Sequence, residues 1–187
     1  MKTSKKSRLY RHIGNFFIII SLVGFGLVFI PFLISYLPRE QEAIDRSSSV
    51  FIPKINAYAP VIYNVDPFDA AVYKKALTQG VAHAKGSSVP GSPGTVYLFA
   101  HSSGLPWEMT RYNTIFLRLN ELNQGDKIYV YKDGKEYIYS VENKKEVWPQ
   151  EVSYLVDSAK NDQLILQTCS PIGTDLKRLL VFASPAL

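Results

Sequence analysis

The chain has 187 residues, and 47% of them are hydrophobic. This length predicts one domain with appendages, and this composition excludes a disordered chain. The formal net charge is +5, but five of the 21 basic residues precede an apolar run near the N-terminus, which leaves 16 to set against 16 acidic residues. The rest of the chain is therefore formally neutral, and the charge does not indicate a nucleic-acid partner.

The apolar run at residues 16–37 carries no charged residue. At about 1.5 Å per residue, such a helix is long enough to cross a bilayer core of roughly 30 Å. Residues 1–15 contain basic but no acidic side chains, and the positive-inside rule places such a segment in the cytoplasm. A cleaved signal peptide is the alternative, but its apolar core usually spans only about 7–15 residues. We expect a cytoplasmic segment at 1–15, a single membrane anchor at 16–37 and everything after it outside the cell.

After the apolar run, residues 38–49 are polar and indicate a linker. Two short strands are expected at 50–55 and 59–65, the first at an edge or with a bulge because it contains a proline. A helix then follows. Asp66 is expected to be its N-cap, with Pro67 at the first helical position and Gly80 at its end.

The second half of the chain predicts mainly strands. Asp133 and Gly134 form a hairpin signal, because glycine permits a positive φ in a tight turn. A short apolar helix is expected within 107–120 and a helical turn within 149–161. Strands are expected at 95–100, 127–131, 136–141 with a continuation at 144–148, 163–168 and 178–183. Residues 50–187 therefore predict a mainly β domain, a closed or nearly closed antiparallel barrel of seven or eight strands with one or two short helices.

Cys169 is the only cysteine in the chain and ends one of these apolar runs. A lone thiol in an exported domain has two interpretations, an inert core residue or a nucleophile. Its thiolate is the reactive form, and with an ordinary pKa of about 8.5 only a small fraction is ionised at neutral pH.

His101 ends the run at 95–100, and Arg178 begins the run after Cys169. If the three strands are neighbours, an imidazolium can stabilise the thiolate and protonate a leaving amine. A guanidinium can stabilise a tetrahedral oxyanion, with Lys177 as the reserve cation. The pattern indicates acyl transfer on a peptide through a thioester.

Other site chemistries have weaker support. His83 is expected after the helix, in a structural or substrate-lining role, and His12 lies among the basic residues before the membrane run. Too few cysteines and histidines lie outside for a zinc site. Glu142 and Glu146 are more typical of a solvated face than of a calcium site. We expect no metal and no cofactor.

These residues resemble the sortases, the membrane-anchored cysteine transpeptidases of bacterial surfaces. The sortase signature is Thr-Leu-x-Thr-Cys followed by an arginine at the start of the last strand, and residues 165–169 read Ile-Leu-Gln-Thr-Cys, with Arg178 beyond. A buried strand running into the histidine is present at 96–101, and the looser motif Ile-Pro-Lys-Ile at 52–55. Residues 80–83 and 90–94 are also similar to the stretch ahead of the histidine in several classes.

The resemblance implies an eight-stranded sortase barrel with Cys169 as nucleophile, His101 as acid and base, and Arg178 as stabiliser of substrate and oxyanion. Thr168 and His83 are assigned to substrate binding. The implied substrate is a surface protein with a C-terminal sorting signal of the Leu-Pro-x-Thr-Gly type, cut between Thr and Gly. The implied acceptor is an amine, of a peptidoglycan precursor or of a pilin lysine.

Two positions depart from the family pattern. Ile165 stands where the first Thr of the signature is expected, and Ala100 stands where a Gly often precedes the histidine. Neither removes a reacting group. The short segment between residues 147 and 163 argues against classes with a long helical insertion there.

Two rival functions remain. An L,D-transpeptidase also uses Cys, His and Arg, but places its arginine two residues after the cysteine, whereas here the gap is nine residues. The other rival is a membrane-tethered barrel that binds a partner without catalysis. Its aromatic surface would be consistent with the 13% aromatic content, although strands favour aromatic residues too.

Overall fold

The computed structural model describes residues 5–34, 45–102, 112, 114–156 and 161–186. The chain divides into two compact units, residues 1–37 and 38–187. The first unit contains one long helix, α1 (Lys5–Ile34). Within it, Arg8–Leu27 is long and apolar enough to span a membrane, with a mean hydropathy of 1.3. The helix thus begins before the expected anchor at 16–37, whose last three residues lie outside the described ranges.

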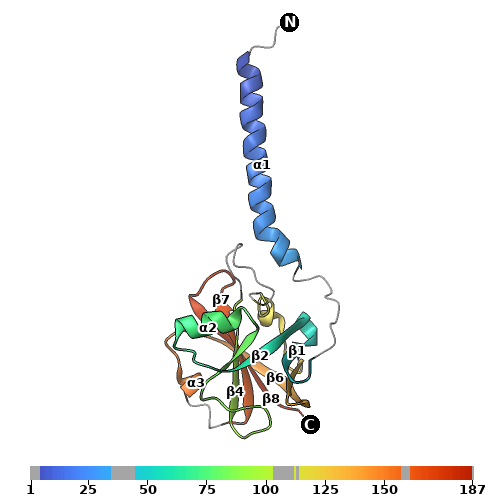
Figure 1. Ribbon diagram of the computed structural model, residues 1–187, viewed down its shortest axis with the longest axis vertical. Coiled ribbons are helices and arrows are strands. Elements are labelled where there is room, and N and C mark those ends of the chain that lie inside the picture. The colour runs from blue at the N-terminus through green and yellow to red at the C-terminus, as the bar shows by residue number, and fades with distance from the viewer. Residues whose placement is uncertain (1–4, 35–44, 103–111, 113, 157–160, 187) are drawn as a thin grey trace. The chain divides into compact units, whose positions relative to one another are not determined.

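The second unit is a closed barrel with the strand order β1-β2-β3-β4-β7-β8-β6-β5 (Figure 1). Its eight described strands confirm the predicted mainly β barrel, and the short helices α2 (Ala70–Leu77) and α3 (Ser153–Val156) lie at its periphery. The strands are β1 (Ser48–Ile52), β2 (Ala57–Val65), β3 (Val81–Ala84), β4 (Thr95–Phe99), β5 (Lys127–Lys132), β6 (Lys135–Val147), β7 (Gln163–Ser170) and β8 (Lys177–Pro185).

The barrel is mainly antiparallel, as expected, but two of its strand pairs are parallel. β2 pairs with β3 in parallel, and β4 pairs with β7 in parallel. Parallel neighbours need a crossover connection, and α2 lies in the connection between β2 and β3. β3 itself was not expected as a strand, because its four residues are all buried and show no alternation.

Two local predictions also need correction. The first strand ends at Ile52, and Pro53 begins the 3-10 helix η1 (Pro53–Ile55), since proline cannot donate to a strand ladder. The helix N-cap is Asp69, whose carboxylate accepts from the backbone N–H groups of residues 71 and 72. Asp66 instead accepts from the backbone N–H of Phe68 in a preceding turn.

Other predicted elements differ less. The 127–141 hairpin turns at Asp133 and Gly134, both with positive φ, as expected. The strand predicted at 136–141 continues without a break to Val147, past an irregularity in its pairing with β8. The apolar stretch at 115–119 forms buried turns that lead into the 3-10 helix η2 (Leu119–Glu121). The predicted helical turn within 149–161 is α3.

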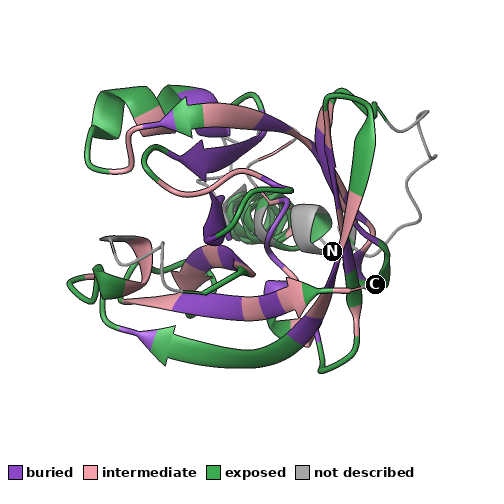
Figure 2. Cartoon of the chain, turned by 90° about the horizontal axis from the view of Figure 1, so that it is seen from below, coloured by how far each residue is buried: buried purple, intermediate pink, exposed green. Residues whose placement is uncertain are grey.

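The barrel interior holds the hydrophobic core. Strand residues that face inward are almost fully buried, while α2 is mostly exposed, as the purple and green regions of Figure 2 show. The core includes Val96 and Leu98 of β4, and Leu164 and Leu166 of β7. The strands whose ends carry the predicted site residues are thus held by packing on their inner face.

Gly80 separates α2 from β3 and lies against β2. A Cβ at this position would lie 2.3 Å from the carbonyl oxygen of Pro60, so we expect Gly80→Ala to lower the free energy of unfolding by about 1–3 kcal/mol, as overpacking does. Chemical denaturation of the full-length chain in detergent, followed by near-ultraviolet circular dichroism, measures this. Gln79→Ala at the exposed neighbouring position is the control. Equal stability of the two variants would contradict the close packing of Gly80 on β2.

Candidate functional site

Three strand ends bring the predicted site residues to one rim of the barrel. The parallel β4–β7 ladder runs in register up to Phe99 opposite Gln167, and the backbone N–H of Ala100 donates to the carbonyl oxygen of Gln167 at 3.1 Å. His101, two residues beyond the end of β4, therefore lies at the level of Cys169, the penultimate residue of β7. On the other side of β7, Cys169 is the direct antiparallel partner of Arg178. The three strands are therefore neighbours, which the sequence alone could not establish.

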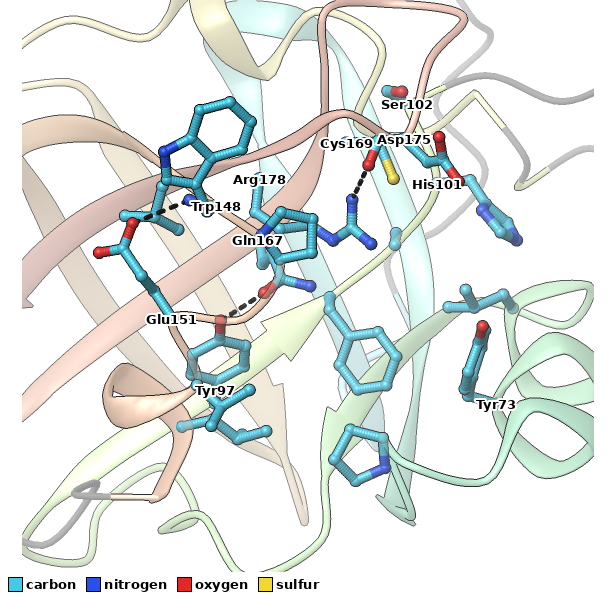
Figure 3. A pocket seen from close by; sticks show the side chains of 18 of the residues that line it. Tyr73, Tyr97, His101, Ser102, Trp148, Glu151, Gln167, Cys169, Asp175 and Arg178 are labelled. Atoms are coloured by element: carbon cyan, nitrogen blue, oxygen red, sulfur yellow. Dashed lines mark hydrogen bonds between the residues drawn. The ribbon is translucent and has the colours of Figure 1, made fainter.

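A pocket of about 720 Å³ opens at this rim (Figure 3). Cys169, His101 and Arg178 all line it, and all three are half-buried. Figure 3 shows the Cys169 sulfur between the Arg178 guanidinium and the His101 ring. The other lining residues come from α2 and its approach, from β4 and the residues that follow it, from β7, from the segment around α3, and from the β7–β8 connection. They include Phe68, Tyr73, Leu77, Tyr97, Phe99, Ser102, Val147, Trp148, Glu151, Val152, Leu155, Gln167, Thr174 and Asp175.

Alternation along β7 separates the residues that face the pocket from those that face the core. Cys169 and Gln167, two residues apart, both line the pocket. Thr168 between them is buried and does not line it. The Thr168 hydroxyl donates to the carbonyl oxygen of Ala100 at 3.0 Å. The hydroxyl thus ties the end of β7 to the residue before His101.

The charge environment of Cys169 contains opposing influences. Burial raises the pKa of the Cys169 thiol, the Arg178 guanidinium lowers that pKa, and the Asp175 carboxylate raises it. Arg178 is held at the rim by the protein backbone, because its Nη1 donates to the carbonyl oxygens of Asp175 at 2.9 Å and Lys177 at 3.1 Å. A fixed cation beside a partly buried thiol opposes the effect of burial on thiolate formation.

His83 lies elsewhere. It is buried in β3, outside the lining of this pocket, and its ring packs on Tyr63 with centroids 4.9 Å apart. Its Nδ1 accepts from the backbone N–H of Asn64 at 3.4 Å, and its Nε2 lies 2.8 Å from the carbonyl oxygen of Ser88. Burial lowers the pKa of His83. These contacts favour a neutral, structural histidine, and a substrate-binding role for it stays a prediction.

Some lining residues carried no signal in the sequence. The Tyr97 hydroxyl donates to the Gln167 side-chain oxygen at 2.6 Å, and the Glu151 carboxylate accepts from the backbone N–H of Trp148 at 2.9 Å. The signal that could have found them is the alternation of side chains along a strand. Tyr97 and Gln167 lie an even number of residues before His101 and Cys169, so they share the pocket face of β4 and β7.

The reserve cation and the acidic residues form surface contacts. Lys177 pairs with Glu146 at 3.4 Å and lies over the ring of Trp148. Glu146 also accepts a hydrogen bond from the Ser170 hydroxyl. In the parts of the chain that the structure describes, no three His, Cys, Asp or Glu side chains are grouped as metal ligands would be.

Comparisons with known proteins identify the family of this chain. The family model described as Sortase domain matches residues 50–186. Sortase D of Bacillus subtilis (strain 168) is 29% identical over 151 residues, which are 79% of this chain and 66% of the relative. Sortase A of Bacillus anthracis is 30% identical over 142 residues, 76% of this chain and 59% of the relative. The chain thus spans less than two thirds of the length of each of these two proteins.

A solved structure shows the same fold. It is Clostridium perfringens sortase C with the C-terminal cell wall sorting motif, at 27% identity and a TM-score of 0.61. The match covers 80% of this chain and 74% of that one.

Because Arg178 and Asp175 shift the pKa of Cys169 in opposite directions, removing either charge should shift that pKa the other way. We expect Arg178→Gln to raise the pKa of the Cys169 thiol, because a cation that stabilises the thiolate is lost, and Asp175→Asn to lower it, because a repelling carboxylate is lost. Alkylation by iodoacetamide at a series of pH values, followed by intact mass, measures both, since only the thiolate reacts. Lys177→Gln is the control for a nearby cation. Shifts of the same sign in the first two variants would contradict the described charge environment.

Proposed function

The chain belongs to the sortase family, and from that premise we propose that it is a cysteine transpeptidase that acts on surface proteins. The observation that carries the proposal is the convergence of Cys169, His101 and Arg178 on one pocket. A half-buried thiol at the wall of an open pocket also argues against the inert core cysteine. An L,D-transpeptidase places its arginine two residues after the cysteine. Here Arg178 lies nine residues after Cys169, on the next strand, as its direct cross-strand partner, which argues against that class.

The proposed substrate is a sorting signal of the Leu-Pro-x-Thr-Gly type at the C-terminus of a surface protein. The pocket offers apolar and aromatic side chains on both flanks, among them Phe68 before α2 and Trp148 and Val152 before α3. Such walls suit apolar peptide side chains. The Clostridium perfringens sortase C structure was solved with the C-terminal cell wall sorting motif, which supports this substrate class for the present chain.

In the proposed first step, the Cys169 thiolate attacks the carbonyl carbon of the Thr residue. The resulting oxyanion receives hydrogen bonds from Arg178, whose guanidinium retains donors beyond the Nη1 bonds to the backbone. The Thr–Gly C–N bond then breaks, the His101 imidazolium gives its proton to the departing amine, and the Thr acyl group remains on sulfur as a thioester.

In the proposed second step, an acceptor amine attacks the thioester carbonyl. Neutral His101 takes a proton from that amine, the C–S bond breaks, and the Cys169 thiolate is restored beside the imidazolium. The overall reaction exchanges one amide bond for another. The proposed acceptor is the amine of a peptidoglycan precursor or of a pilin lysine, and access to the rim decides between them.

The proposed location is the cell surface. The α1 segment Arg8–Leu27 is long and apolar enough to anchor the chain in a membrane, and the basic residues before it favour a cytoplasmic N-terminus. We propose a cytoplasmic segment at 1–15, an anchor at 16–37, a linker at 38–49 and an extracellular catalytic barrel at 50–187.

A peptide and amine screen tests this function. Peptides with Leu-Pro-x-Thr-Gly variants are incubated with the full-length chain in detergent and either triglycine or a lysine-containing peptide, and products are weighed. We expect Cys169→Ala to lose all transfer, because no thioester can form, and His101→Ala to come close to this. Arg178→Lys should lose about 100- to 1000-fold in rate, because a point charge does not replace a planar guanidinium at an oxyanion.

Ser92→Ala, on a loop outside the site pocket, is the control for handling and folding. Transfer by the Cys169→Ala protein at the wild-type rate would reject the mechanism.

A further inference from the structure

Two further polar residues, Tyr97 and Gln167, line the site pocket beside the three proposed catalytic residues. We call the part of the pocket lining that they form its floor. Tyr97 of β4 and Gln167 of β7 lie on adjacent parallel strands and both line the pocket (Figure 3). Tyr97 is only 3% exposed, and its hydroxyl donates to the Gln167 Oε1 at 2.6 Å. Burial raises the pKa of Tyr97, so its phenol stays protonated and remains a donor.

This hydrogen bond fixes what the Gln167 side chain can offer to a ligand. A glutamine side chain has one acceptor oxygen and one NH₂ group with two donors. With the oxygen engaged by Tyr97, the NH₂ group is turned to the other side of the carboxamide. Figure 3 shows this nitrogen on the side away from Tyr97, in the pocket. Among the described residues, no hydrogen bond from this nitrogen is present, so a bound molecule with an acceptor would satisfy it.

The position of Gln167 along β7 relates it to the proposed substrate. Gln167 and Cys169 are two residues apart on the same face of the strand, which corresponds to about 6.6 Å. An extended peptide along this floor, with its reacting carbonyl at Cys169, covers the same distance in two residues. In Leu-Pro-x-Thr, the residue two places before Thr is Pro, which has a carbonyl acceptor but no backbone N–H. The NH₂ group of Gln167, a donor, matches a residue that can accept a main-chain hydrogen bond but cannot donate one.

We propose that Gln167 is a substrate-recognition residue. Its NH₂ group donates to the main-chain carbonyl two residues before the acylated residue, and Tyr97 is the positioning residue that holds the carboxamide in this orientation. This inference rests on the proposed function, because it takes an extended peptide as the ligand. It assigns a role to the variable position of the Thr-Leu-x-Thr-Cys signature in this chain.

The test measures peptide recognition at Cys169 without requiring transfer. The probe is Leu-Pro-Ala-Thr with a vinyl sulfone in place of the Thr carbonyl, and the reference is acetyl-Thr with the same group. Alkylation rates of the full-length chain in detergent are measured by intact mass, and their ratio gives the preference for the peptide. Iodoacetamide rates monitor the thiol itself.

We expect Gln167→Leu to lower the ratio about 2- to 10-fold, the usual effect of one neutral hydrogen bond. Tyr97→Phe should lower it by a similar or smaller factor, and the double variant should match Gln167→Leu, because both changes disable the same contact. The iodoacetamide rate should not change. Tyr129→Phe on β5, outside the pocket, is the matched control. The Gln167→Leu effect should persist with a Pro-Ala-Thr probe and vanish with an Ala-Thr probe.

The outcomes that overturn the inference are distinct from a failure of the proposed function. A wild-type preference for the peptide that Gln167→Leu leaves unchanged refutes the role of Gln167 and leaves the function intact. A Gln167→Leu protein that loses reactivity equally with iodoacetamide refutes a specific recognition role. A wild-type protein with no preference for the peptide probe refutes both the inference and the proposed peptide substrate.

Discussion

The parallel pairing of β4 with β7 is the constraint on which the site depends. Parallel neighbours run in the same direction, so their carboxyl ends meet at one edge of the sheet, and the in-register ladder from Thr95 to Phe99 fixes which residues meet there. An antiparallel pairing would place His101 and Cys169 at opposite ends of the barrel. The hydrogen bond from Thr168 to the Ala100 carbonyl extends this alignment beyond the last ladder pair. β8, returning antiparallel to β7, then adds Arg178 at the same level.

The two faces of β4 and β7 have different functions. The inner face packs into the barrel core with residues such as Leu98 and Leu166, which are fully buried. The outer face carries Tyr97, Gln167 and Cys169 into the pocket. Because strand side chains alternate with a period of two, rigid packing of one face fixes the position of the reacting groups on the other. Desolvation penalises the thiolate form of the half-buried Cys169. Arg178, anchored by the backbone carbonyls of Asp175 and Lys177, opposes that penalty.

Much of this could be predicted from local sequence, because the site residues sit at the ends of apolar runs and the Asp133–Gly134 turn marks its own hairpin. The parallel partners could not, because strand order is set by long-range packing. β3 was missed because its residues are all buried and have no polar alternation. Asp66 was expected to cap α2, but Asp69, three residues later, has the same carboxylate and is the N-cap in the structure. The Tyr97–Gln167 hydrogen bond joins residues 70 positions apart, and only the strand register reveals it.

The proposed chemistry requires the sulfur of Cys169 to accept the acyl group of a peptide at this rim. The most direct measurement is the intact mass of the full-length protein after brief incubation with a Leu-Pro-x-Thr-Gly peptide without an added amine, quenched in acid and followed by peptide mapping. We expect a mass gain equal to the peptide acid that ends in Thr minus one water, located on Cys169 and removed by hydroxylamine. A protein that cleaves the peptide at that bond while never carrying the acyl group, or that carries it on another residue, would contradict the account.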